Sequence, residues 1–371
     1  MDLAFYKGKK VLLTGHTGFK GSWLSTILVN CGAKVIGFSS CSKTETRLFD
    51  LCGVEKEIVH IKGNIQHFSA LLGVFQLYQP EIVFHLAAQP LVRESYKNPV
   101  DTYMTNVIGT VNLLEAVRST GSVRSMLNIT TDKVYENKEW EWGYRENEPL
   151  DGYDPYSNSK SCSELVTHSY IRSFFSQHSP SDAPNYDKHG CVSDVNIAVS
   201  TARAGNVIGG GDFAKDRIIP DCVRAAVKKE DIIVRNPSSI RPYQHVLEPL
   251  FAYLLIAQKQ YEEPKKYIGY YNVGPDEKDC VSTSTLVDLF CQEWEEGLKW
   301  INQAESSAPH ESNFLKLDCS KMKHVFGWQP RWNIKTAVEK TVEWTKCWVS
   351  GGDIRKCMNQ QIANFVDFLG G

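Results

Sequence analysis

Tyr156 and Lys160 are the two residues whose types and spacing most directly suggest chemistry. Side chains four residues apart share a face of a helix, so the Lys160 ammonium can lie beside the Tyr156 phenol. A neighbouring cation lowers the pKa of a phenol from its ordinary value of about 10. Such a tyrosine can accept a hydroxyl proton while a nicotinamide ring accepts the hydride from the same carbon. The pair therefore predicts the oxidation of an alcohol.

The position of this pair distinguishes it from two others with the same spacing, Tyr6/Lys10 and Tyr261/Lys265. Pro155 precedes Tyr156, and proline is favoured in the first turn of a helix. One of the other pairs straddles the start of a predicted strand, and a proline interrupts the other. Only the first pair is therefore predicted to share a helical face. An exposed surface pair is the alternative interpretation.

A second group of reactive side chains, Thr131-Asp132-Lys133, follows a predicted strand at residues 125–130. Ligands of open parallel sheets bind at the carboxyl ends of the strands. A threonine hydroxyl there can bond the oxygen that Tyr156 deprotonates. The acid and base beside it are groups that an oxidation alone does not need. The alternative is an ion-paired loop without a catalytic role.

A glycine-rich turn, Gly15-x-x-Gly18-x-x-Gly21, separates the first predicted strand from the first helix. This is where the pyrophosphate of a dinucleotide meets a helix N-terminus, so the turn predicts a dinucleotide coenzyme. No acidic residue follows the second strand to bind the adenosine ribose. Lys43 and Arg47 occur there instead, and basic residues can accept the extra phosphate of NADP. The turn itself therefore leaves NAD and NADP open.

The strands and helices that must position these residues alternate regularly in the first half of the chain. Short apolar segments at 11–14, 34–38, 82–86, 125–130 and 195–202 are separated by helical patterns. This alternation predicts an α/β fold with a Rossmann-type, doubly wound parallel sheet. The second half is less regular, and we expect a smaller C-terminal mixed α/β substrate domain. The predicted domains are 1–205 and 206–371, with segments that can interleave.

The bulk composition is that of a globular protein with a large core. The chain has 371 residues, 42% of them hydrophobic, and a formal net charge of −2. Because it has no long basic or apolar run, we expect no nucleic-acid and no membrane partner. Its eleven cysteines show no zinc-binding spacing, so no metal site is predicted and reduced thiols in the cytoplasm are expected.

The chain also resembles a known family, the extended short-chain dehydrogenase/reductases, and within it the CDP-glucose branch of the nucleotide-sugar 4,6-dehydratases. The segments that carry the resemblance are 15–24, 85–93, 131–135, 142–149, 153–160, 203–212 and 240–249. Together they span most of the chain, from about residue 8 to residue 348. The resemblance implies NAD as the coenzyme, a nucleotide sugar as the substrate and a place in deoxysugar biosynthesis.

The chemistry that the resemblance implies has three steps. Tyr156 removes the proton of the carbon-4 hydroxyl, Thr131 bonds that oxygen, and Lys160 holds the phenolate and the nicotinamide ribose. Water leaves across carbons 5 and 6 while Asp132 protonates the departing hydroxyl, and the hydride then returns to carbon 6. Lys133 replaces the glutamate of the dTDP-glucose enzymes. It is either the base for carbon 5 or a group that stabilises enolate charge.

The resemblance also implies a set of binding residues. The coenzyme contacts expected are Gly15, Thr17, Gly18, Phe19, Lys20, Gly21, Asn64, Ile65, Leu86, Ala87, Ala88, Gln89, Asn106, Tyr156 and Lys160. The substrate contacts expected are Gln89, Arg93, Asn206, Arg241 and Asn272. Two positions depart from the family pattern, because Asn64 replaces an aspartate that touches adenine and Phe314 replaces a tyrosine.

The sequence leaves open three alternative functions and the oligomeric state. The alternatives are a nucleotide-sugar 4-epimerase, a 4,6-dehydratase for another nucleotide sugar, and a non-catalytic NAD-sensing protein. An epimerase does not need the Asp132 and Lys133 pair, and a sensor does not need the full catalytic set. The family habit predicts a homodimer or homotetramer formed through helices near residues 98–118 and 156–175.

Overall fold

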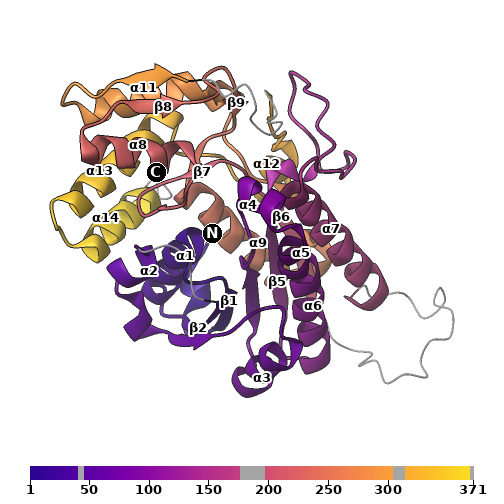
Figure 1. Ribbon diagram of the computed structural model, residues 1–371. Coiled ribbons are helices and arrows are strands. Elements are labelled where there is room, and N and C mark those ends of the chain that lie inside the picture. Colours follow the sequence, from indigo (N-terminus) through magenta and orange to yellow (C-terminus); the bar gives the residue numbers. More distant parts are fainter. Residues whose placement is uncertain (41–45, 176–196, 304–313, 368–371) are drawn as a thin grey trace.

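A seven-stranded parallel sheet forms the centre of the computed structural model, which describes residues 1–40, 46–175, 197–303 and 314–367 (Figure 1). Its strand order is β11-β6-β5-β4-β1-β2-β3, and all neighbouring strands run parallel. The strands are β1 (Lys10–Thr14), β2 (Lys34–Ser39), β3 (Val59–Lys62), β4 (Ile82–His85), β5 (Ser125–Thr130), β6 (Ala198–Arg203) and β11 (Tyr270–Asn272). The predicted Rossmann-type fold is confirmed.

Helices cover both faces of this sheet, because apolar side chains alternate between the two faces of each strand. On β1, Val11 and Leu13 belong to one buried cluster and Leu12 to the other. The first cluster packs against α1 (Phe19–Asn30), α2 (Leu48–Leu51), α9 (Leu247–Glu262), α12 (Ser320–Phe326) and α14 (Ile354–Asp367). The second packs against α3 (Phe68–Tyr78), α6 (Gly109–Thr120) and α7 (Pro155–Tyr170).

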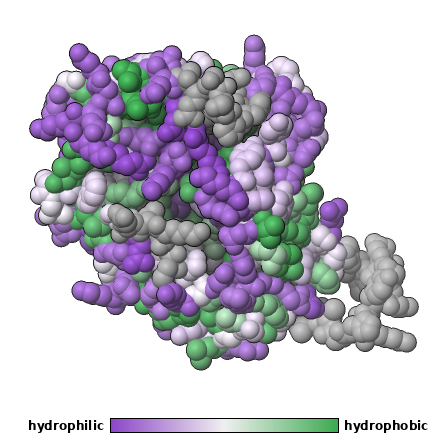
Figure 2. Space-filling view, in the orientation of Figure 1, coloured by the Kyte–Doolittle hydropathy of each residue, from purple (hydrophilic) through white to green (hydrophobic). Residues whose placement is uncertain are grey.

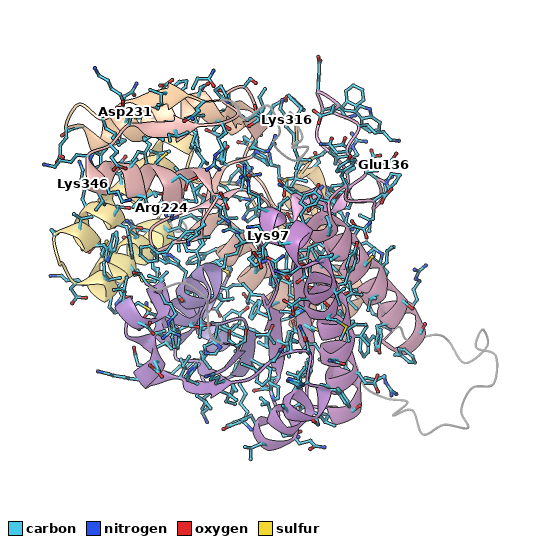
Figure 3. All side chains as sticks on the ribbon, in the orientation of Figure 1. Lys97, Glu136, Arg224, Asp231, Lys316 and Lys346 are labelled. Atoms are coloured by element: carbon cyan, nitrogen blue, oxygen red, sulfur yellow. The ribbon has the colours of Figure 1, made fainter. Side chains whose placement is uncertain are left out.

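Between β4 and α6 the chain forms a short helix, α4 (Val92–Lys97), and then a helix that continues directly into α6. That helix begins with α5 (Pro99–Tyr103) and passes through a π-helical turn, η3 (Met104–Ile108), so the helix expected near residues 98–118 is present. Single π-helical turns inside helices often occur at functional sites. Asn106, a predicted coenzyme contact, lies in this turn. Lys97, at the end of α4, is labelled near the middle of Figure 3.

A smaller mixed lobe follows β6 and has its own apolar core. Its helices are α8 (Ile218–Lys228), α11 (Thr283–Trp294) and α13 (Ile334–Val349), whereas the short helix α10 (Pro264–Tyr267) packs against α9. Its short strands are β7 (Val207–Ile208), β8 (Ile232–Val234), β9 (Ile240–Arg241), β10 (Gln244–His245), β12 (Val281–Ser282) and β13 (Trp300–Asn302). Charged side chains of both signs lie on this lobe, as Arg224, Asp231 and Lys346 show in Figure 3.

Two elements that follow the predicted boundary at residue 205 belong to the main sheet and the helices that cover it. β11 comes from the second half of the chain, yet it pairs with β6 and forms an edge of the main sheet. Helix α9, also from the second half, packs against β5 and β6. The segments therefore interleave. No helix among the described residues is long and apolar enough to cross a membrane.

Candidate functional site

The N-terminus of α7 fixes Tyr156. The Asp154 side chain accepts the Ser157 N–H at 3.0 Å, and Pro155 occupies the first helical position. An aspartate cap followed by proline is a strong start signal for a helix. The Tyr156 N–H donates to Ser95 Oγ of α4 at 3.1 Å. Tyr156 is therefore held in the first turn of α7, as the sequence predicted.

Lys160 lies one turn further along α7 and is almost completely buried. Its Nζ donates to the carbonyl of Ile129 in β5 at 3.1 Å. Burial lowers the pKa of Lys160 to about 8, and the nearby Glu164 carboxylate opposes that change. An ammonium has three donors, so Lys160 can hold β5 and still offer donors to groups in the site.

The expected lowering of the Tyr156 pKa is wrong for the protein on its own. Burial raises the pKa of Tyr156 to about 12, although a hydrogen bond with Thr131 and the charge of Arg217 act in the opposite direction. Asp132 and Asp154 raise it further. The cost of removing an anion from water therefore exceeds the stabilisation from neighbouring donors.

Thr131 and Asp132 stand together at the carboxyl end of β5. The Thr131 hydroxyl donates to Asp132 Oδ1 at 2.8 Å, and the Asn206 amide donates to Oδ2 at 3.0 Å. Gly205 packs directly against this carboxylate, since a β-carbon built there would overlap it. Thr131 also lies close enough to Tyr156 to lower the pKa of that phenol. The structure thus brings these predicted residues into one cluster.

Lys133 follows in the short 3₁₀ helix η4 (Asp132–Val134) and is half-buried. Its N–H donates to Thr131 Oγ1 at 3.4 Å. Its ammonium forms no ion pair with any residue in the described part of the chain. Lys133 therefore lies next to the cluster, and its two expected roles, base for carbon 5 or stabiliser of enolate charge, stay predictions.

The glycine turn has the shape that a pyrophosphate requires. Gly15 has a φ of +75°, and a β-carbon there would lie 2.7 Å from the Ala87 nitrogen. A β-carbon on Gly18 would meet only the Gly15 carbonyl, at 3.4 Å, so the other side of Gly18 is open. Helix α1 has no side-chain cap and no acid in its first turn. Its N–H groups can therefore bind an anion, and the residues fit a dinucleotide.

Lys20 lies within this turn, and charged residues of the catalytic cluster influence its pKa. Burial and the charges of Arg217 and Lys160 lower the pKa of Lys20 to about 7, while Asp132 and Asp212 oppose the change. Its Nζ lies 6.0 Å from the centre of the Tyr253 ring. Lys20 comes from the α1 side of the sheet and Lys160 from the α7 side, so two amines converge at one strand edge.

Arg217 was missed by the sequence reasoning. It directly precedes α8, donates to Asp212 at 2.9 Å, and its charge lowers the Tyr156 pKa. The segment around it has no periodic pattern, and only its position after the 203–212 motif could have drawn attention to it.

Several predicted coenzyme contacts hold loops in place. Asn106 accepts the Gln89 N–H at 2.8 Å and donates to Ser159 of α7 at 2.9 Å. The Gln89 side chain in turn bonds the Leu91 backbone and Thr102. These bonds tie the loop after β4, which carries Leu86, Ala87 and Ala88, to the catalytic helix. Asn106 therefore acts by positioning this loop.

At the predicted adenosine end, Thr17 Oγ1 lies 2.8 Å from Ser39 Oγ, where β2 ends. Asn64 accepts the Gln66 N–H at 3.0 Å, and the neighbouring Ile65 is buried in the second apolar cluster. Arg47 forms a two-pronged ion pair with Asp50. Lys43 lies outside the described residues.

The predicted substrate residues have different outcomes. Asn272 is fully buried and donates to the carbonyls of Tyr144 and Asp318 while accepting from Tyr135. These three bonds hold the fold together, and the substrate contact expected of Asn272 stays a prediction. Arg93 is half-buried in α4, which packs against α7. Arg241 is buried in β9 and donates to the Ile240 carbonyl.

A buried ion pair holds in place the helix that carries Tyr156 and Lys160. Glu164, one turn beyond Lys160, bonds Arg203 of β6 through both carboxylate oxygens at 3.0 Å. Thr130 and Thr201 donate to the same carboxylate. Burial alone would raise the pKa of Glu164, but the charge of Arg203 and hydrogen bonds with His168, Arg203 and Thr130 lower it to about 2. The pair fixes α7 against β5 and β6.

The fold and the site together define a protein class. A Rossmann-type parallel sheet with a glycine turn after β1 and a Tyr-x-x-x-Lys helix is the arrangement of the extended short-chain dehydrogenase/reductases. Residues 12–341 match the family model described as GDP-mannose 4,6 dehydratase, and the chain belongs to this family. The resemblance predicted from the sequence is confirmed.

Relatives cover nearly the whole chain. It is 45% identical over 366 residues to CDP-glucose 4,6-dehydratase of Salmonella typhimurium, covering 99% of this chain and 98% of that protein. A solved structure of UDP-glucose 4-epimerase from Thermotoga maritima superposes with a TM-score of 0.76 at 21% identity, covering 91% and 99% of the two chains. The NAD complex of dTDP-glucose 4,6-dehydratase from Bacillus anthracis gives 0.71 at 20% identity, covering 91% and 97%.

Proposed function

We propose that this chain is an NAD-dependent CDP-glucose 4,6-dehydratase, which forms CDP-4-keto-6-deoxyglucose and water. The relative from Salmonella typhimurium supports the substrate, and the family supports the reaction type. The observation that carries the proposal is the Thr131 hydroxyl, which donates to Asp132 at 2.8 Å and lies close enough to Tyr156 to lower its pKa. A base for the oxidation and an acid for the elimination thus lie in one cluster, and a dehydratase needs both.

In the proposed reaction, NAD when bound supplies the acceptor for the carbon-4 hydride and returns that hydride at carbon 6. Tyr156 accepts the carbon-4 hydroxyl proton, and Thr131 orients the oxygen. Lys160, anchored at the Ile129 carbonyl, offers its remaining donors to the phenolate and to a ribose. Asp132 gives a proton to the carbon-6 hydroxyl as it leaves.

The proton at carbon 5 needs its own acceptor. In this proposal Lys133 is the first candidate, because it is adjacent to Asp132 and half-buried. An ammonium accepts a proton only after losing one, so a stabilising role towards enolate charge is the second candidate. Exchange of deuterium into carbon 5 by a Lys133→Met variant separates the two, since loss of exchange with retained oxidation marks the base.

The proposed binding residues follow from the fit of the site. The glycine turn, Asn64, the loop from Leu86 to Gln89 and Lys20 would hold NAD. Arg93 and Arg241 are proposed to bind the substrate diphosphate, which suits the fork geometry of arginine.

The deciding experiment offers the purified protein three substrates with added NAD: CDP-glucose, dTDP-glucose and GDP-mannose. We expect the 4-keto-6-deoxy product, identified by mass spectrometry and its alkaline absorbance, from CDP-glucose. Turnover of another nucleotide sugar alone would refute the substrate. Inversion at carbon 4 without loss of water would show a 4-epimerase, and no turnover with retained NAD binding would show a coenzyme-sensing protein.

Assembly through the helices beside the site is part of the proposal. An apolar depression is lined by Pro99, Val100, Tyr103, Met104, Val107, Ile108 and Cys162. Val100 is 76% exposed, and Leu165 of α7 is 50% exposed on the same side of the sheet. Figure 2 shows green side chains at the centre right, over α5 and α6. Such a face fits a homodimer or a homotetramer, which light scattering would detect.

A cytoplasmic location completes the proposal. The nine cysteines in the described part of the chain are all free thiols. Reduced thiols persist in the cytoplasm.

A further inference from the structure

The Asp132 carboxylate is held on three sides. Thr131 donates to Oδ1, Asn206 donates to Oδ2, and Gly205 leaves the space that the carboxylate fills. Asp132 is 1% exposed, so these contacts replace water around it. A buried carboxylate without donors would cost considerable free energy.

The backbone at residue 206 is unusual and serves this contact. Asn206 has a φ of +46°, in the left-handed region that most side chains avoid and that asparagine tolerates. The segment directly after β6 turns here, between Arg203, which bonds Glu164, and β7. At this turn the Asn206 amide points at Asp132 and donates to its Oδ2.

We infer that Asn206 and Gly205 are positioning residues that act through Asp132 in the elimination of water. This inference rests on the proposed function and changes the predicted role of Asn206, from a sugar contact to a donor that aims the acid. Asp132 gives its proton to the carbon-6 oxygen, the carbon–oxygen bond breaks, and the remaining carboxylate is stabilised by the Asn206 donor. The oxidation at carbon 4 does not require this bond.

The test separates the hydrogen bond from the backbone turn. Asn206→Gly keeps the left-handed conformation and removes the amide, whereas Asn206→Asp keeps the shape and replaces the donor. Lys229→Gly is the matched control, because Lys229 also has a positive φ, +59°, but is exposed at the end of α8. Each purified variant is mixed with NAD and CDP-glucose, and product and reduced coenzyme are followed in time.

For both Asn206 variants we expect product formation to slow roughly 10- to 100-fold, the loss typical of one hydrogen bond to a charged group. Because oxidation continues while elimination waits, reduced coenzyme should accumulate. Gly205→Ala, whose β-carbon would displace the carboxylate, should give the same signature. The control should match the unaltered enzyme.

Two results would overturn the inference. A rise in KM at unchanged kcat, without reduced coenzyme, would show that Asn206 contacts the substrate. Equal slowing of coenzyme reduction and product release would show a general structural role. If the unaltered enzyme forms no 4-keto-6-deoxy product, the proposed function fails instead, so the two failures are distinguishable.

Discussion

Replacing Glu164 with glutamine tests how much the buried ion pair beneath the site stabilises the fold. Glu164 and Arg203 are both 0% exposed, and the change removes one of the two charges while keeping the shape. The pKa of Glu164 lies at about 2, against about 4.3 for a free glutamate. At about 1.4 kcal/mol per unit of pKa, this difference corresponds to about 3 kcal/mol. Breaking buried pairs generally costs ~3–5 kcal/mol.

The assay is urea denaturation followed by circular dichroism, with Glu115→Gln as the matched control. Glu115 pairs with Arg118 at the surface, where the two side chains are 30% and 34% exposed. Surface pairs contribute about 0–1 kcal/mol. We expect Glu164→Gln to lower the free energy of unfolding by ~3 kcal/mol or more and the control by less than ~1 kcal/mol.

The same ion pair can be tested by measuring how the free energy of unfolding changes with pH, because the pKa of Glu164 fixes the direction of that change. Because the folded-state pKa of Glu164 is depressed, its contribution is present above about pH 5 and is lost as the pH falls towards 2. The difference between wild type and Glu164→Gln should therefore shrink on acidification. Equal losses for the two variants at pH 7, or a difference that grows in acid, would refute the assignment of this ion pair as a stabilising element.

The remaining predictions concern the reaction and the coenzyme. Tyr156→Phe should abolish formation of reduced coenzyme from CDP-glucose in a stopped-flow experiment, since no base remains for the hydroxyl proton; retained reduction would exclude Tyr156 as that base. Asp132→Asn should permit reduction but slow product formation about 10²- to 10⁴-fold; normal turnover would remove Asp132 from the elimination step. Burial lowers the pKa of Lys20 to about 7, so the Lys20 side chain is charged below that pH. The affinity for NAD, measured by calorimetry, should therefore fall as the pH rises from 6 to 8. Lys20→Met should bind weakly and without this dependence, and an unchanged pH dependence would contradict the reasoning.

Much of the fold follows from strands that are buried on both faces. β1, β4 and β5 are continuous apolar or small-residue runs, and the sequence located them closely. β3 was missed because it is an edge strand whose residues are largely exposed, so it has no apolar run. β11 was missed because three residues carry little pattern. The helix near residues 98–118 was predicted, but its π-helical turn was not, because one such turn leaves the apolar periodicity close to that of a regular helix.

The candidate site was predictable where chemistry depends on local spacing. Tyr156 and Lys160 share a helix, and Thr131 and Asp132 are neighbours in the chain. Contacts between distant segments were not predictable from one sequence. The bond from Asn206 to Asp132 spans 74 residues and depends on a left-handed turn. The pKa of Tyr156 depends on burial by several elements, which no spacing encodes.

The place of β11 in the main sheet has a consequence for the order in which the chain can fold. Until Tyr270–Asn272 has emerged from the ribosome, β6 has a bare edge with unpaired backbone groups. Roughly three-quarters of the protein must therefore be synthesised before the central sheet has all of its strands. A nascent chain that stalls before that point exposes an unpaired strand edge, to which other chains can bind. A fragment that ends at residue 205 would contain β6 without β11, and the backbone groups on that edge of the strand would remain unpaired.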